Sequence, residues 1–264
     1  MEIKKYNSVM KKSLYPGVLF HFTKTKESLF SILRDGFKVS YAEESVSGAN
    51  GDPKRLGVPM VSFCDLRISE LTQHMGKYGY YGIGLKKAWA NRSKLHPVLY
   101  MNKDHSLFER YGWAVINTYD ALGKGSFYGD GHEQIESSIE IFMNVWRYMK
   151  NYEGRLLRDG SVDDEFRFAD EREWRYVPHL GVSLDYISSE KLDVDGWKAI
   201  WNDKIKDQVL VFTPEDIEYV VVSIEDEVEE YIELIKSFQV NYGSHQVDRL
   251  LTRILTANQI KRDV

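Results

Sequence analysis

Cysteine is nearly absent from this sequence: Cys64 is the single one among 264 residues. One cysteine excludes a disulfide within the chain and disfavours a cysteine-based metal site. The sequence has no run of about 18 apolar residues, the length that a membrane-spanning helix needs. Its first residues lack the apolar centre of a signal peptide. We therefore expect a cytoplasmic protein without a membrane partner.

A strong charge of one sign is also missing. The net charge is −5 and the isoelectric point is about 5.9, so the whole chain has no basic footprint for nucleic acid. The motifs of P-loop, serine-hydrolase, zinc-protease and dinucleotide-binding proteins do not occur. The seven histidines do not fall at metal-ligand spacings with neighbouring carboxylates. We expect no metal.

What the sequence does contain is enough apolar material for a sizeable core, with 43% hydrophobic and 13% aromatic residues. Strand-like and helix-like patterns follow one another without regular alternation, which predicts an α+β fold. We expect a single domain, 1–264, with a helical insertion at about 103–160. A C-terminal helical segment is expected at about 225–260.

The stretch GVLFHFT, residues 17–23, is typical of a short buried strand and carries a titratable side chain near its end. His21 and Thr23 are two positions apart, so both point to one face of a strand. The helix expected next is capped by Thr25 and ends at Gly36. A histidine on an apolar strand is more often a core residue, but a strand end with two hydrogen-bonding groups also suits a ligand.

A second segment, KYGYYGIGL at residues 77–85, holds three tyrosines and three glycines. Glycine weakens a strand unless another backbone or a ligand must approach closely. Tyrosine rings can stack on an aromatic ring of a ligand. Plain aromatic packing beside a bulge is the alternative.

A third segment, DEREWRYV at residues 170–177, alternates like a strand. In an extended chain Glu171, Glu173 and Arg175 share one face. Two interpretations stay open: a surface strand with ion pairs, or a carboxylate that lines a cleft and stabilises positive charge on a sugar.

The Gly, Asn, Asp and Pro content of residues 45–57 predicts a mobile loop. Its basic side chains, Lys54 and Arg55, are candidates for target binding. An ordinary solvated loop is an equal alternative.

The order of HFT, YGYYGIGL and EREWRY along the chain resembles the AbiGi family of bacterial abortive-infection proteins. The resemblance is strongest over residues 19–44, 58–70 and 78–89. A more distant similarity is to ADP-ribosyltransferase folds of the DarT-like and PARP-like kind, which also place a histidine on a first strand and a glutamate on a late strand. This similarity implies a split, mixed β core that binds NAD.

The ADP-ribosyltransferase resemblance implies roles for individual residues. The implied NAD-binding residues are His21, Phe22, Thr23, Tyr78 and Tyr81. Tyr81 would stack on the nicotinamide, with Tyr78 and Tyr80 as rivals. Glu173 would be the catalytic glutamate, with Glu171 as the alternative.

These resemblances lead to two hypotheses of different class. In the first, the protein is an NAD-dependent ADP-ribosyltransferase of anti-phage defence that modifies a nucleic acid or protein acceptor. NAD would be its substrate, without a metal. In the second, the AbiGi resemblance implies a non-catalytic antitoxin that neutralises a partner toxin. The acidic C-terminal helices would suit a basic partner.

Overall fold

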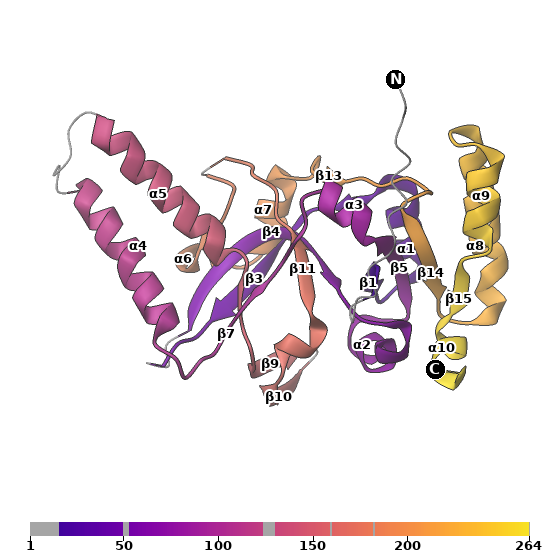
Figure 1. The fold of residues 1–264 in the computed structure, drawn as a ribbon, viewed down its shortest axis with the longest axis horizontal. Coiled ribbons are helices and arrows are strands. Elements are labelled where there is room, and N and C mark those ends of the chain that lie inside the picture. The colour runs from indigo at the N-terminus through magenta and orange to yellow at the C-terminus, as the bar shows by residue number, and fades with distance from the viewer. Residues whose placement is uncertain (1–15, 50–52, 124–129, 159, 182, 264) are drawn as a thin grey trace, which may run out of the picture.

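A mixed β-sheet forms the centre of the molecule (Figure 1). The computed structural model describes residues 16–49, 53–123, 130–158, 160–181 and 183–263. The spatial order of the main strands is β15 (Ile254–Thr256), β14 (Ile217–Val222), β5 (Tyr81–Lys86), β1 (Val18–Thr23), β4 (Lys54–Cys64), β11 (Glu173–Tyr176) and β6 (His96–Pro97). Two further strands, β3 (Ser40–Val46) and β12 (Ile187–Ser188), pair with β4. Within the described residues of this sheet, the β14–β15 pairing is parallel and the others are antiparallel.

Helices cover both faces of the sheet, which explains why its strands read as continuous apolar runs. On β1, Leu19 belongs to the larger core, while Phe20 and Phe22 belong to a second core on the opposite face. The larger core is covered by α1 (Lys26–Asp35), α3 (Lys87–Arg92), α8 (Val228–Ser237) and α9 (Ser244–Leu251). The second core is covered by α2 (Leu71–Tyr78) and α10 (Ala257–Asp263).

Two antiparallel helices, α4 (Leu107–Gly123) and α5 (Asp130–Trp146), form a hairpin at the far end from the C-terminal helices (Figure 1). The remaining elements are short. They are β2 (Phe37–Lys38) paired with β13 (Val209–Leu210), β7 (Leu99–Met101) with β8 (Met149–Asn151), β9 (Gly154–Arg158) with β10 (Ser161–Phe166), the helices α6 (Ser189–Leu192) and α7 (Trp197–Lys204), and the 3₁₀ turns η1 (Ile68–Glu70), η2 (Phe168–Glu171), η3 (Glu225–Glu227) and η4 (Phe238–Val240).

The α+β class predicted from the sequence is confirmed. The first helix has the predicted ends: the Thr25 side chain accepts a hydrogen bond from the Ser28 amide, and Gly36 follows the last turn with φ +86°. The division into one domain with an insertion stays a prediction. Among the described residues, no helix combines the length and the apolar character needed to cross a bilayer.

Three predictions about elements were wrong. The loop expected at 45–57 is shorter, because β3 and β4 pair over seven positions from Ser40↔Met60 to Val46↔Lys54. Buried Val46 and Leu56 hold these strand ends in place. Glu171 lies in η2 rather than in β11, since Arg172 takes a left-handed conformation that interrupts the extended chain. The C-terminal segment expected to be helical at about 225–260 is interrupted by β15, whose residues pair with β14.

Candidate functional site

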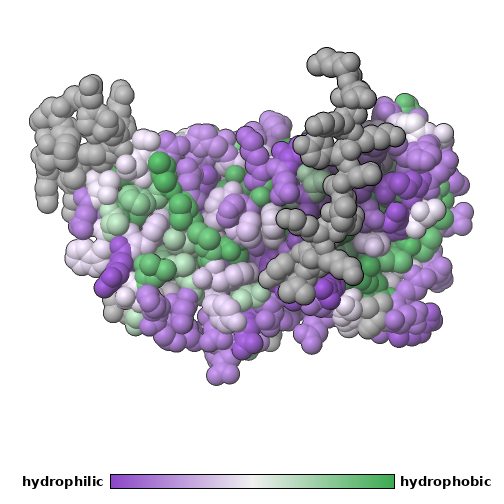
Figure 2. Space-filling model, viewed as in Figure 1, coloured by the Kyte–Doolittle hydropathy of each residue, from purple (hydrophilic) through white to green (hydrophobic). Residues whose placement is uncertain are grey.

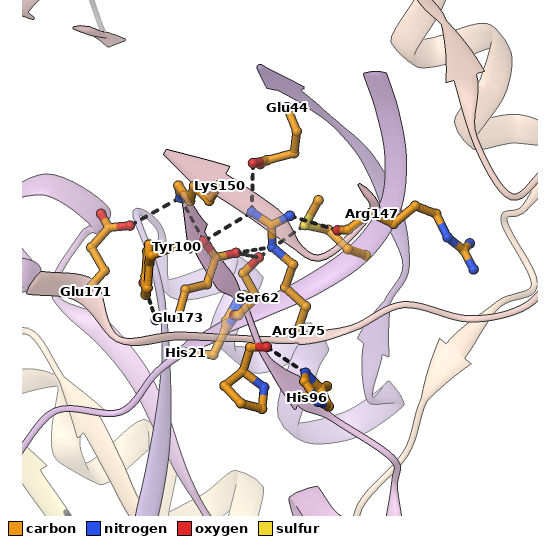
Figure 3. A network of polar contacts seen from close by, with 12 residues as sticks. His21, Glu44, Ser62, His96, Tyr100, Arg147, Lys150, Glu171, Glu173 and Arg175 are labelled. Carbon is orange, nitrogen blue, oxygen red and sulfur yellow. Dashed lines mark hydrogen bonds and ion pairs between the residues drawn. The ribbon is translucent and has the colours of Figure 1, made fainter. Parts of the chain in front are cut away.

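Oppositely charged side chains from four elements meet beside β11 (Figure 3). They are Glu44 of β3, Lys150 of β8, Glu171 of η2, and Glu173 and Arg175 of β11. We call these five residues the ionic cluster. Arg175 is fully buried, and Glu171 and Glu173 are exposed by only 7% and 6%. Charges this deep in a protein need partners, so the partners define what the site can do.

Glu173 is held on both carboxylate oxygens. Oε1 accepts hydrogen bonds from Arg175 Nε at 2.7 Å and from Ser62 Oγ at 2.8 Å. Oε2 accepts from Lys150 Nζ at 2.7 Å. Its backbone amide donates to the Tyr100 hydroxyl at 2.8 Å. Two cations and a hydroxyl therefore satisfy this carboxylate from within the chain.

Arg175 spans the gap between β11 and its neighbours. Besides Glu173, its guanidinium donates to Glu44 Oε2 at 2.7 Å and to the Arg147 carbonyl at 2.9 Å. The planar fork of arginine suits this three-way arrangement better than a lysine ammonium would. The residue thus links β11 to β3 and to the end of α5.

Lys150 joins the two glutamates that the sequence singled out. Its ammonium lies 2.7 Å from Glu173 Oε2 and 3.4 Å from Glu171 Oε2. The other oxygen of Glu171 accepts a hydrogen bond from the Tyr78 hydroxyl. Tyr78 in turn stacks on His74, with 4.3 Å between the ring centroids. The cluster therefore extends to α2.

The pKa values of these groups follow from burial opposed by charge. Burial alone would raise the pKa of the Glu173 carboxyl, but the charges of Arg175 and Lys150 outweigh it and hold that pKa below its usual value. Burial would lower the pKa of Lys150, and the surrounding glutamates raise it instead. Glu173, Lys150 and Arg175 are thus all ionised at neutral pH.

His21 has a different environment. Burial lowers the pKa of its imidazole, and the Ser62 carbonyl, 2.8 Å from Nδ1, partly opposes that shift. A carbonyl can only accept, so Nδ1 carries the proton and the neutral ring is the stable form. The ring packs against Phe37 and Phe63, with centroids 5.1 and 5.6 Å away. One side of the His21 ring therefore packs in the apolar core, which is the more common role of a histidine on an apolar strand.

A cavity of about 280 Å³ lies beside the ionic cluster. It is lined by five of the seven residues for which the sequence predicts a catalytic or NAD-binding role: His21, Phe22, Tyr78, Glu171 and Glu173. A neighbouring cavity of about 440 Å³ shares His21 and Ser62 with it. Segments far apart in the sequence thus meet at one place, although the roles of these residues stay predictions.

The other predicted residues lie elsewhere. Thr23 does not line this cavity. The Tyr81 hydroxyl donates to Glu227 Oε1 at 2.8 Å, beside the C-terminal helices. Tyr80 lies under the Lys261 ammonium, 3.7 Å from its ring centroid. Of the three rival tyrosines, Tyr78 is the one beside the glutamates.

The two basic candidates for target binding begin β4. Lys54 is exposed, and Arg55 pairs with Glu43 at 2.6 Å and with Asp193 at 2.7 Å. Exposed ion pairs of this kind contribute little to stability. Their role in target binding stays a prediction.

Sequence reasoning missed Lys150, Glu44 and Ser62. Each is an ordinary residue in its local pattern, and the partners in Glu173–Ser62 and Arg175–Glu44 are 111 and 131 positions apart. One signal was available: a buried strand with alternating Glu and Arg requires further charges to balance it.

These features define an α+β protein in which a deeply buried glutamate is engaged by the chain's own lysine, arginine and serine. A family model described as "Putative abortive phage resistance protein AbiGi, antitoxin" matches residues 36–223. The chain therefore belongs to the AbiGi family of abortive phage resistance proteins, as the sequence motifs predicted.

The chain is also similar to a named relative. It is 27% identical over 241 residues to the abortive phage resistance protein AbiGi of Lactococcus lactis subsp. cremoris. The alignment spans 83% of this chain and 93% of that protein. No solved structure matches the chain. An ADP-ribosyltransferase fold therefore stays a prediction, while the AbiGi resemblance is confirmed.

The expectation of an ADP-ribosyltransferase enzyme was wrong, because the matching family is described as an antitoxin. The geometry offers a physical reason. A catalytic glutamate must accept a new hydrogen bond from a ribose hydroxyl as positive charge develops. The Glu173 oxygens already accept from Ser62, Lys150 and Arg175.

Proposed function

We propose that this chain is the antitoxin of a two-component anti-phage defence system: a non-catalytic protein that binds a partner toxin and neutralises it. The family description supports the antitoxin role. The structural observation that carries the proposal over an enzyme is the engagement of both Glu173 oxygens by buried donors of the same chain. The cluster then serves to join strands and helices into one scaffold.

Growth of a bacterial host distinguishes an antitoxin from a toxin. Expression of this chain alone in a bacterial host should leave growth unchanged. Co-expression with the toxin of the same defence system should restore growth that the toxin alone arrests. Growth arrest by this chain alone, or arrest by the toxin that is unchanged in its presence, would contradict the proposal.

Neutralisation by binding also has a biochemical signature. The two purified proteins should elute together in size-exclusion chromatography, earlier than either protein alone. Glu173→Gln should retain neutralisation in every preparation that is still folded, since the carboxylate has no chemical step to perform. Loss of neutralisation by a variant with unchanged circular dichroism would instead assign Glu173 a direct role.

NAD as a ligand is a separate proposal, favoured by the shared cavity of His21, Tyr78 and Glu171. Its volume of about 280 Å³ lies just below the ~300–1,000 Å³ of drug-sized ligand sites. The neighbouring cavity, which also has His21 in its lining, adds room. Calorimetric titration of NAD into the wild type and into His21→Ala tests this: equal heats, or none, would exclude the site.

A further inference from the structure

Helix α5 carries apolar and polar side chains that lead in different directions. Hydrophobic residues gather over the α4–α5 hairpin on the face shown in Figure 2. Polar side chains in the last turns of α5 instead meet the connection between β11 and β12. Glu140 of α5 lies beside His179 and Asp185 of that connection, and each of the three offers one metal-ligand atom. These three atoms all lie within 4.8 Å of one another.

The spacing of residues along α5 brings Glu140 to this place. Glu140, Asn144 and Arg147 follow one another at intervals of four and three, so they share one face at the end of the helix. The buried Arg147 guanidinium fixes that face against the β11–β12 connection, since it donates to the carbonyls of Pro178 at 3.1 Å and Asp185 at 3.0 Å. Figure 3 shows Arg147 at the edge of the ionic cluster.

Asp185 is buried and oriented before any ligand binds. Its Oδ1 accepts a hydrogen bond from the Leu180 amide at 2.5 Å and lies 3.4 Å from Arg147 Nη1. Its backbone amide donates to the Gly181 carbonyl at 3.0 Å. The other carboxylate oxygen, Oδ2, lies 2.7 Å from His179 Nδ1. Outer contacts of this kind hold a ligating carboxylate in a metal site.

The ligand atoms of the three residues converge on one point. His179 Nδ1 lies 2.7 Å from Asp185 Oδ2 and 3.7 Å from Glu140 Oε1. A tetrahedral ion with bonds of about 2.1 Å holds its ligand atoms about 3.4 Å apart, between these two separations. The side chains of His179 and Glu140 are 62% and 43% exposed. They therefore have room for the small shift that coordination requires.

The simplest alternative is an ion pair of a protonated His179 with the two carboxylates. An imidazolium Nδ1 needs one acceptor, whereas here carboxylates from two separate elements face the same nitrogen. An ion that replaces the Nδ1 proton, which leaves to solvent, satisfies all three side chains at once. The positive charge of Arg147 opposes such an ion, so we expect weaker binding than at a site without a cation.

The donor set indicates which ion fits. Imidazole nitrogen suits Zn²⁺ and other transition metals, while Mg²⁺ prefers oxygen ligands in a near-ideal octahedron. Three protein ligands with a water in the fourth position are a common arrangement for Zn²⁺. One imidazole with two carboxylates therefore favours Zn²⁺.

We propose that Glu140, His179 and Asp185 form a binding site for a divalent transition-metal ion, with Zn²⁺ the best fit, and that the ion ties α5 to the β11–β12 connection. The site does not depend on the antitoxin function. It revises the expectation of no metal, which considered only ligands that are neighbours in the sequence, whereas Glu140 comes from a distant segment.

The test is calorimetric titration of Zn²⁺ into the chelator-treated full chain. The wild type should bind one ion, and Mg²⁺ should not displace it. Glu140→Gln and His179→Ala should each weaken the Kd by at least about 10-fold. His245→Ala is the control, since His245 is an exposed histidine of α9; it should bind like the wild type. Replacement of the buried Asp185 would also disturb folding, so the two more exposed ligands are tested instead.

Thermal melting gives a second measurement. An ion that binds the folded chain raises its melting temperature, so Zn²⁺ should stabilise the wild type and His245→Ala but not His179→Ala. A wild type that binds no Zn²⁺ would overturn the site. Equal binding by the wild type, Glu140→Gln and His179→Ala would overturn it too, as would an equal loss in His245→Ala, which would indicate scattered surface histidines. The growth assays of the antitoxin function are unaffected by any of these results.

Discussion

Glu173 organises the charges at the centre of this protein. Its carboxylate contacts two cations and a hydroxyl group, and of these three partners only Arg175 is near it in the sequence. A buried ion pair often adds little net stability compared with apolar packing, whereas removal of one partner leaves an uncompensated charge. Replacing Glu173 should therefore destabilise the protein mainly because the buried charges of Lys150 and Arg175 lose their partner.

We expect Glu173→Gln to lower the free energy of unfolding by about 3 kcal/mol, because it leaves two buried cations short of a counter-charge. Urea denaturation followed by circular dichroism measures this change. The matched control is Asp164→Asn in the exposed Arg155–Asp164 pair, whose side chains are 70% and 78% accessible. That variant should lose less than about 1 kcal/mol. Equal losses in the free energy of unfolding would show that the ionic cluster contributes no more to stability than an exposed ion pair.

The lowered pKa of Glu173 predicts how stability depends on pH. The carboxyl holds its proton less tightly in the folded state than in the unfolded state, where its pKa is near 4.5. Its contribution is therefore complete above that value and is lost as the pH falls towards the lower folded pKa. Between about pH 6 and about pH 3 the wild type should lose more stability than Glu173→Gln. Parallel stability curves for the two proteins would contradict the shift.

At the scale of elements, the turn from α2 into β5 shows where glycine is required. Gly79 has φ +113°, and a Cβ added there would lie 2.1 Å from the Thr23 carbonyl oxygen of β1. Gly76 lies three residues earlier, within α2, and a Cβ added at that position would meet no atom within 4 Å. One glycine is thus needed by the close approach of β1, and the other is not.

We expect Gly79→Ala to destabilise the protein by about 2–3 kcal/mol through backbone strain and the clash with Thr23. Gly76→Ala should instead stabilise it by up to about 1 kcal/mol, since alanine is the better helix former. Thermal melting of the two variants beside the wild type tests both signs at once. A tolerated Gly79→Ala would mean that β1 and this turn are farther apart than the structure shows.

Much at this scale could be predicted. The apolar run of β1, the Thr25 cap and the Gly36 end identify a strand followed by a helix, because these signals are local. The break at Arg172 and the short strand β15 could not be predicted. Each depends on a neighbour that is distant in sequence: the Asp65 amide donates to the Arg172 carbonyl, and β14 pairs with β15.

At the scale of the whole molecule, the net charge of −5 predicts how a complex with a basic toxin responds to salt. Raising the ionic strength from about 0.05 to about 0.5 M shortens the Debye length from about 14 to about 4 Å, so the long-range attraction of a basic toxin weakens. Stopped-flow association should slow by at least about 10-fold, with a smaller change in the dissociation rate. A rate independent of salt would exclude electrostatic steering by the net charge of the chain.

By itself, the sequence determined the order of most strands and helices, the α+β class and the family, because periodicity, caps and motifs are carried by neighbouring residues. The resemblance to ADP-ribosyltransferases also named Glu171, Glu173 and Tyr78 among its candidate residues, and these three line one cavity, although their roles stay predictions. Only the tertiary structure decided what that site contains, since strand order brings Ser62 and Lys150 to Glu173 from distant segments. Burial then makes those contacts obligatory, because a carboxylate without partners could not be kept ionised in the interior.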